Sequence, residues 1–183
     1  MKTLVVNLFG GPGCGKSTFR AALFHCLKTM QMDVEEVPEF AKDLVWSGRE
    51  RELAWQPTIF GEQYRRMKAL EGQAGIIVTD SPLLLQALYC YRNGGLDQNL
   101  IAPIAAYAAS FNNFNCLLRY PKRNYTPAGR TQTEDEAKSL HWDTERLLNS
   151  FVGHSGWKHI TEADVENVAR VSVRRLRVLN STD

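Results

Sequence analysis

Glycines are concentrated in a short segment near the start of the chain, just before a lysine and a serine. Gly10, Gly15, Lys16 and Ser17 match the Walker A pattern Gly-x-x-x-x-Gly-Lys-Ser. A row of phosphates carries dense negative charge, and a backbone with few side chains lets several amide N–H groups approach it at the positive end of a helix. The segment therefore predicts a phosphate-binding loop.

The lysine and the serine of this segment have separate expected roles. Lys16 is expected to reach the terminal phosphates, and Ser17 to place its hydroxyl on Mg²⁺. The alternative is a glycine-rich turn that caps a helix, but a lysine at the positive end of a helix is unfavourable without an anion. We predict ATP and Mg²⁺ as cofactors, with nucleotide contacts from Gly10, Gly11, Pro12, Gly13, Cys14, Gly15, Lys16, Ser17 and Thr18.

A carboxylate follows the apolar run 76–79. Asp80 occupies the place expected for the residue that holds Mg²⁺ directly or through water. It can also complement the start of a helix ahead of Pro82, and the two roles are compatible. Ser17 and Asp80 are therefore the predicted metal residues, and Lys16 and Asp80 are predicted to be catalytic.

Arginines mark a polar segment between a predicted strand and a predicted helix. We predict a lid loop at about 121–133, in which Arg130 and Arg123 stabilise the charge of a phosphoryl transition state and exclude water. Loop arginines are otherwise solvated, and Arg119 can equally end a strand.

No guanine-reading Asn-Lys-x-Asp is present, and the chain has little room for the long additions of ring-forming or transporter ATPases. These features favour a small kinase.

Four polar residues are candidates for binding an acceptor hydroxyl. Glu39 follows a predicted strand, where it can orient the hydroxyl or act as a general base. Equally, Glu39 and Asp43 can complement the start of a short helix. Gln63 lies on an apolar helical stripe and must find a partner, either a substrate or an internal group. Arg66 is a candidate phosphate contact or a solvated residue.

The elements that must position these residues alternate along the chain. Short apolar runs read as strands, and apolar residues at helical spacing read as helices. Thr133 and Glu136 form a capping box that opens a helix, and Ser81 with Pro82 is a good helix start. The predicted strands are 3–9, 33–37, 75–80, 115–120 and 158–161, and the predicted helices lie at about 16–30, 59–70, 82–91, 100–111, 133–151 and 165–179.

This alternation predicts an α/β fold with three layers, a parallel sheet with helices on both faces. The 183 residues suit a single domain, 1–183, and the net charge of +2 shows no global preference for nucleic acid. The four scattered cysteines read as reduced thiols of a cytoplasmic protein without a membrane partner. The histidines have no metal-ligand spacing.

Four segments together resemble a group of small P-loop kinases common in bacteriophage genomes, related to nucleoside and nucleotide kinases. They are VNLFGGPGCGKST, EFAKDLVW, TDSPLL and TPAGRTQTEDEA. Members include enzymes that phosphorylate 5-hydroxymethyluracil within DNA. The resemblance implies a five-stranded P-loop NTPase sheet, Mg·ATP as donor, Asp80 at the metal and Arg130 in the lid, in the host cytoplasm if the protein is phage-encoded. Ser81 departs from deoxynucleoside kinases, which carry an arginine there.

These observations together predict an ATP-dependent phosphotransferase that acts on a hydroxyl of a nucleotide-like acceptor. The leading acceptor is the 5-hydroxymethyl group of 5-hydroxymethyluracil in duplex DNA, as a step in thymine hypermodification. The alternatives are a kinase of free nucleosides or nucleoside monophosphates, and an NTP-hydrolysing regulatory module. A stripe of arginines near the end of the chain, Arg170, Arg174 and Arg177, is either a nucleic-acid contact or a solvated helix face.

Overall fold

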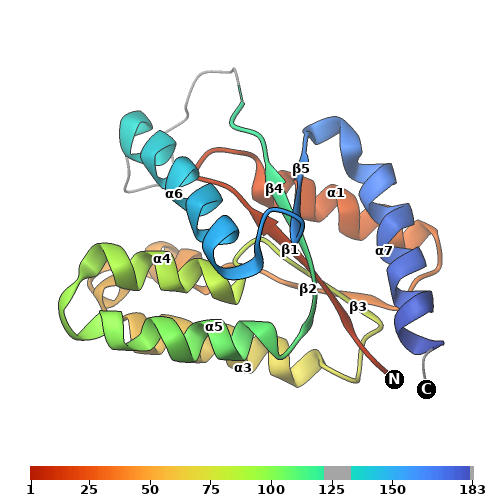
Figure 1. The fold of residues 1–183 in the computed structure, drawn as a ribbon, viewed down its shortest axis with the longest axis horizontal. Helices are drawn as coiled ribbons and strands as arrows, with labels where there is room; N and C mark the ends of the chain where they lie inside the picture. The colour runs from red at the N-terminus through yellow and green to blue at the C-terminus, as the bar shows by residue number, and fades with distance from the viewer. Residues whose placement is uncertain (122–132, 182–183) are drawn as a thin grey trace.

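A single parallel sheet forms the centre of the molecule. The computed structural model describes residues 1–121 and 133–181. Within them, five strands lie in the order β2-β3-β1-β4-β5, all parallel (Figure 1). The strands are β1 (Leu4–Phe9), β2 (Val34–Val37), β3 (Ile76–Thr79), β4 (Asn112–Leu118) and β5 (Trp157–Ile160).

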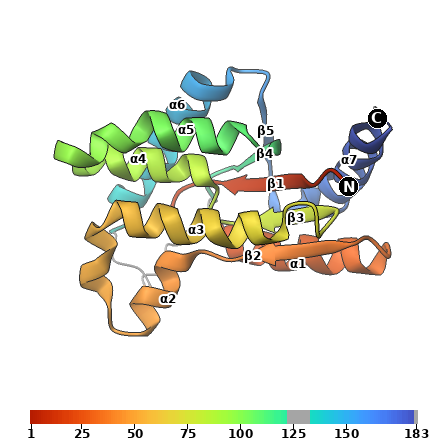
Figure 2. The same cartoon turned by 90° about the horizontal axis from the view of Figure 1, so that it is seen from below.

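Helices cover both faces of this sheet. Helix α1 (Lys16–Thr29) and helix α7 (Val165–Asn180) pack on one face. The opposite face is covered by α3 (Gln56–Leu70), α4 (Leu83–Asn93), α5 (Ile101–Ala109) and α6 (Glu134–Val152). Figure 2 shows α1 on one side of the strands and α4 and α5 on the other. The short helix α2 (Phe40–Trp46) follows β2, and 3₁₀ turns span Glu50–Ala54, Gly95–Leu100 and Glu162–Asp164.

The alternation of side chains along β1 explains these layers. Val6 and Leu8 face the core beneath α1 and α7, whereas Val5 and Phe9 face the helices on the other side. All six residues of β1 are buried, as a strand with both faces covered requires. Within the described residues, no helix is long and apolar enough to cross a membrane.

The order of the strands fixes where a ligand can bind. The chain first builds the sheet on one side of β1, with β2 and β3, and then on the other, with β4 and β5. In open parallel sheets of this kind, the crevice lies beyond the carboxyl ends of the strands, where the direction of building reverses. The loop after β1 therefore lies at that crevice.

The predicted fold is confirmed, with differences at the ends of elements. All five strands and the capping box at Thr133 and Glu136 are present. The prediction that Ser81 caps α4 is wrong. Pro82, in an extended conformation, is the residue before the first helical turn, and the Ser81 hydroxyl instead accepts a hydrogen bond from the side chain of Gln86.

Candidate functional site

The loop between β1 and α1 has the backbone of a phosphate-binding loop. Gly13 and Gly15 adopt left-handed conformations, with φ of 84° and 88°, which residues other than glycine rarely adopt. Gly15 immediately precedes α1, so the first turn of the helix opens toward the crevice. The amide groups of this turn lack carbonyl partners within the helix and are suited to an anion.

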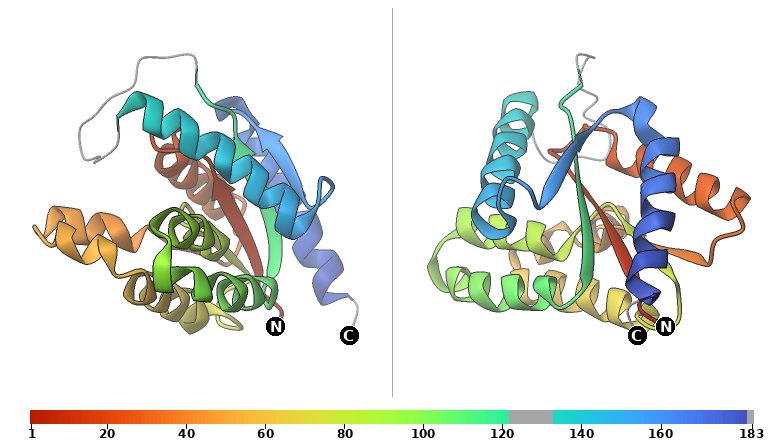
Figure 3. Two further views of the ribbon diagram at one scale, coloured as in Figure 1. Left: turned by 60° about the vertical axis from the view of Figure 1, so that its left-hand side comes forward. Right: turned by 45° about the vertical axis from the view of Figure 1, so that its right-hand side comes forward.

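A second glycine of the loop lets α6 approach it closely. A Cβ atom at Gly11 would lie 2.4 Å from the carbonyl oxygen of Ala137 and 2.9 Å from the Cβ of His141. The Gly11 amide donates to Nδ1 of His141 at 3.3 Å, and Figure 3 shows α6 passing across this end of the sheet. The loop is therefore fixed from two directions, by α1 behind it and by α6 beside it.

Lys16 bends back over the loop. Its ammonium group donates to the carbonyl oxygens of Gly10 at 2.8 Å and of Gly11 at 3.1 Å. A cation at a helix N-terminus is unfavourable without an anion, and these carbonyls compensate for part of that cost. The ammonium can exchange one of these oxygens for a phosphate oxygen without moving away from the loop.

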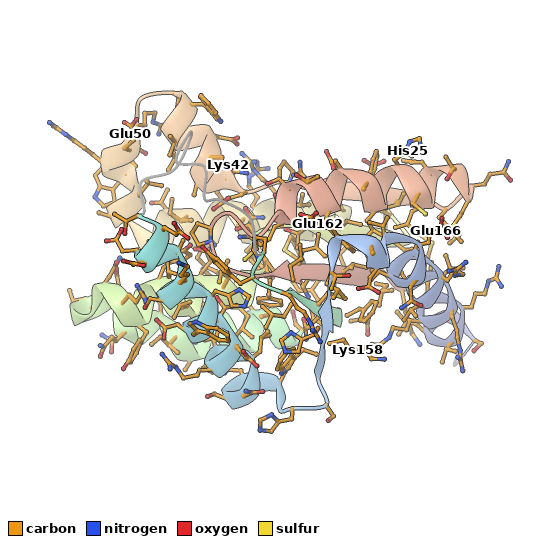
Figure 4. All side chains as sticks on the ribbon, turned by 90° about the horizontal axis from the view of Figure 1, so that it is seen from above. His25, Lys42, Glu50, Lys158, Glu162 and Glu166 are labelled. Atoms are coloured by element: carbon orange, nitrogen blue, oxygen red, sulfur yellow. The ribbon has the colours of Figure 1, made fainter. Side chains whose placement is uncertain are left out.

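Two oxygen groups of the site suit Mg²⁺. They are the Ser17 hydroxyl and the Asp80 carboxylate, both of the hard-oxygen type that Mg²⁺ prefers. Each is now contacted by a cationic side chain. Lys42 donates to the Ser17 hydroxyl at 2.6 Å, and Figure 4 shows Lys42 near the start of α1. Among the described residues no cluster of three or more His, Cys, Asp or Glu can hold a metal. Mg²⁺ is commonly held by one or two protein oxygens together with substrate phosphates, and the Ser17 and Asp80 oxygens fit an ion shared in this way.

Asp80 is buried and paired with an arginine from α1. Its Oδ1 lies 3.4 Å from Nη1 of Arg20, whose Nε lies 3.3 Å from Glu36 Oε2. That Nε is buried and makes no hydrogen bond to any described residue. The guanidinium therefore compensates the charge of Asp80 through a single long contact.

Glu39 lies half-buried at the end of β2, as the residue before α2, and its side chain does not cap that helix. Burial raises the pKa of the Glu39 carboxyl above its ordinary value, while the charges of Lys16 and Lys42 act in the opposite direction. Asp80 acts with burial to raise this pKa. Lys42 contacts Ser17 beside Lys16, and the Phe40 amide is joined through Gln63 to Thr79 beside Asp80, so the structure brings Lys16, Glu39 and Asp80 to one region. A carboxyl with a raised pKa is well matched to accept a proton near neutral pH.

The other acceptor candidates are bonded to one another or to the protein. The Arg66 guanidinium donates to Asp43 at 2.7 Å and to Glu62 at 2.9 Å, and it lies over the Phe40 ring. Arg66 and Asp43 thus meet, although they come from different helices. An acceptor that binds here must share this ion pair or displace it.

Gln63 has internal partners. Its Oε1 accepts from the Phe40 amide at 3.2 Å, and its Nε2 approaches the Pro38 carbonyl and the Thr79 hydroxyl at 3.4 and 3.5 Å. The sequence left a substrate and an internal bond as alternatives, and the structure provides the internal bond. Gln63 thereby ties α3 to the segment that carries Glu39.

The remaining candidates lie around the rim or outside the description. Arg119 is exposed at the end of β4, in an open cleft that also contains Cys14, Tyr120 and Thr161. Two tryptophans that follow Glu39 in the chain and that were not singled out from the sequence above, Trp46 and Trp55, are largely exposed. The arginines of the α7 stripe are exposed, and Arg170 is paired with Glu166.

The predicted lid lies almost entirely outside the described residues, in the segment 122–132. This segment includes Arg123 and Arg130, and their roles stay predictions.

Sequence reasoning missed three residues of this site. Arg20 and Lys42 look like ordinary charged residues of helices, and only the fold brings them to Asp80 and Ser17. His141 had a usable signal, because it shares a face of α6 with buried Ala137, Leu140 and Thr144. A histidine on a buried face needs a polar partner, but the sequence does not show that the partner is the loop after β1.

Comparison with known proteins gives a family match over most of the chain. Residues 5–166 match the sequence profile of the family AAA_28, described as an AAA domain. Among curated protein sequences, none matches this chain. The family match covers the loop after β1, the acidic residues and all five strands.

Solved structures with this fold include nucleotide-binding proteins. A NadR protein in complex with NR has a TM-score of 0.67 and 16% identity, over 95% of this chain and 51% of that chain. Deoxyadenosine kinase from M. mycoides, with dCMP and dCDP bound, has a TM-score of 0.56 and 16% identity, over 95% of this chain and 99% of that one. This chain thus spans about half of the NadR chain. At such identity the likeness concerns the fold, and it confirms the predicted three-layer P-loop architecture.

Proposed function

Since the chain belongs to the AAA_28 family of AAA domains, we propose that it is an ATP-dependent kinase that transfers the γ-phosphoryl group to a hydroxyl of a nucleotide-like acceptor. The observation that carries this proposal is the placement of Glu39 beside the phosphate-binding loop. Lys42, on the helix that follows Glu39, contacts Ser17, and Gln63 joins the Phe40 amide to Thr79, the residue before Asp80. A carboxyl base in this place can accept the proton of an acceptor hydroxyl, which is the step that transfer to an alcohol requires. The deoxyadenosine kinase structure that shares the fold supports the same reaction class.

On the donor side, the protein binds and orients the triphosphate. The main chain of the loop and the N-terminus of α1 supply amide donors, and Lys16 neutralises charge on the terminal phosphates. Bound Mg²⁺ would supply neutralisation of the developing charge, with Ser17 and Asp80 as the residues that hold it. Arg20 keeps the Asp80 carboxylate compensated until then.

On the acceptor side, Glu39 is the residue that receives the proton. An alcohol has a high pKa, so proton transfer is late and positioning contributes most of the acceleration. Asp43 and Arg66 contact the part of the acceptor that does not react. Gln63 contributes by fixing the Pro38 and Phe40 backbone on either side of Glu39.

We infer that the leading acceptor is the 5-hydroxymethyl group of 5-hydroxymethyluracil in duplex DNA. The resemblance of four segments to phage kinases supports it, and the exposed Trp46 and Trp55 are suited to stacking on bases at the rim. The second candidate is a free nucleoside or nucleoside monophosphate. It is favoured by the fold shared with deoxyadenosine kinase and NadR, whose structures hold dCMP and NR.

One assay distinguishes these acceptors. Labelled ATP is offered with hydroxymethyluracil duplex, the matched thymine duplex, free nucleosides or nucleoside monophosphates, and the labelled product is identified. Label on the hydroxymethyluracil duplex alone supports the DNA acceptor, and label on small molecules alone excludes it. Release of phosphate with no labelled acceptor supports the third candidate, an NTP-hydrolysing regulatory module. In that case Arg130→Ala leaves hydrolysis unchanged without the partner.

A further inference from the structure

His141 makes a contact that the proposed reaction does not use. Its Nδ1 accepts from the Gly11 amide at 3.3 Å and lies 3.4 Å from Sγ of Cys14, so one ring nitrogen serves two residues of the phosphate-binding loop. A nitrogen that accepts an N–H bond carries no proton itself, which requires the neutral tautomer with hydrogen on Nε2. The contact therefore depends on an uncharged ring.

The surroundings keep the ring uncharged. His141 is buried, with 2% of its surface exposed, and the rings of Tyr120 and Trp142 lie edge-on against it. Burial lowers the pKa of the His141 imidazole below its ordinary value, and the charges of Lys16 and His159 act in the same direction, against Glu145. At neutral pH the ring is thus an acceptor.

The contact sets the conformation of the loop through the main chain. Helix α6 fills the space that a side chain at residue 11 would need. The Gly11 carbonyl accepts a hydrogen bond from the amide of Cys14 at 3.3 Å. Gly11 also binds the Lys16 ammonium through that carbonyl. A change at the Gly11 amide therefore reaches both the turn before Gly15 and the lysine.

We infer that His141 is a positioning residue for nucleotide binding, whose Nδ1 fixes the main chain at Gly11 so that the loop is shaped for phosphates before they arrive. This inference rests on the proposed function, in which the loop binds a triphosphate. It assigns the Gly11 amide to the protein, so the amides after it provide the phosphate contacts. A preorganised loop loses less conformational freedom on binding, and the benefit is seen in affinity.

The test compares two replacements of His141. Asparagine keeps an acceptor oxygen on the side chain, whereas leucine fills similar space with none. Calorimetry at pH 7.5 is expected to give His141→Asn a dissociation constant for Mg·ATP within twofold of wild type, and His141→Leu one about tenfold weaker. Steady-state kinetics should show a larger change in the KM for ATP than in kcat for His141→Leu, because preorganisation of the loop acts on binding. His25→Asn, on the exposed side of α1 (Figure 4), is the matched control and binds as wild type does.

The outcomes separate this inference from the proposed function. If wild type binds Mg·ATP and both His141 variants bind equally well, or equally poorly, the acceptor role is wrong and His141 only fills space. If wild type binds no Mg·ATP, the proposed function fails and the inference fails with it. Nitrogen NMR of the imidazole gives an independent readout that does not depend on the variants folding. A proton on Nδ1 at pH 7.5 would overturn the inference.

Discussion

On the donor side of the crevice, the Lys16 ammonium is bonded to main-chain carbonyls of the loop, whereas on the acceptor side the Arg66 guanidinium is bonded to the carboxylates of Asp43 and Glu62. Main-chain groups are present whatever the side chains are, so the donor side depends on glycines and on the closeness of α6. The acceptor side is an ion-pair arrangement that single substitutions rearrange. The proposed donor site is therefore held by the backbone, and the proposed acceptor site by side chains.

Removal of the lysine tests the donor side and should have the largest effect. In Lys16→Ala, transfer is expected to fall about 10³-fold, because a donor aimed at the developing phosphate charge is lost. Steady-state kinetics with labelled ATP measure the change. Lys28→Ala is the matched control, since Lys28 lies on the same helix and its exposed side chain pairs with Glu35. Equal losses in the two variants would contradict the assignment.

Replacement of Glu39 tests the proposed proton acceptor, which lies between the proposed donor and acceptor sites. Glu39→Gln is expected to lower kcat about 10²-fold, because the proton acceptor is lost, and to leave the Mg·ATP dissociation constant within about twofold. Wild-type kcat should fall as the pH decreases through the raised pKa of Glu39, because only the ionised carboxyl accepts a proton. Glu35→Gln, on the exposed part of β2, is the control. An unchanged kcat in Glu39→Gln would remove Glu39 from the mechanism.

The same carboxyl has a predictable effect on stability. A raised pKa means that the folded protein holds this proton more tightly than the unfolded chain does. Stability from this group is therefore present at low pH and is lost as the pH rises through the raised pKa. Thermal unfolding at pH 8 should give Glu39→Gln a Tm at or above that of wild type, and a clear decrease would mean that Glu39 stabilises the fold.

Arg66 tests the acceptor side alone. In Arg66→Ala, the KM for the acceptor is expected to rise about tenfold, the size of a lost charged hydrogen bond, with the ATP dissociation constant unchanged. Arg65→Ala is the matched control, because Arg65 lies next to it on α3 and pairs with the same Glu62 while remaining exposed. A change in ATP affinity rather than acceptor KM would show that the two sides are not separate.

Two glycines test the stability of the loop and its surroundings rather than activity. Gly61→Ala on α3 should stabilise the protein by about 0.5–1 kcal/mol, because a Cβ there meets no atom within 4 Å and alanine favours helix. Gly11→Ala should destabilise it by about 1–3 kcal/mol, because the added Cβ collides with Ala137 on α6. Urea unfolding compares both variants with wild type. Similar stabilities would show that α6 moves away from the loop easily.

The sequence by itself determined the fold and the donor loop. Local rules are sufficient there, because apolar runs, helical spacing and the capping box at Thr133 and Glu136 each act within a few residues. The Walker A pattern is local too, and its glycines fix the backbone that binds phosphate. The exception is the prediction that Ser81 caps α4, because Pro82 is the residue before the first helical turn.

Only the tertiary structure decided which side chains meet at the crevice. Arg20 reaches Asp80 across 60 positions and His141 reaches Gly11 across 130, and no local pattern encodes such pairs. The partners of Gln63 were also decided this way, between an internal bond and a substrate. Contacts of this kind depend on strand order and on how closely helices pack, which are properties of the whole folded chain.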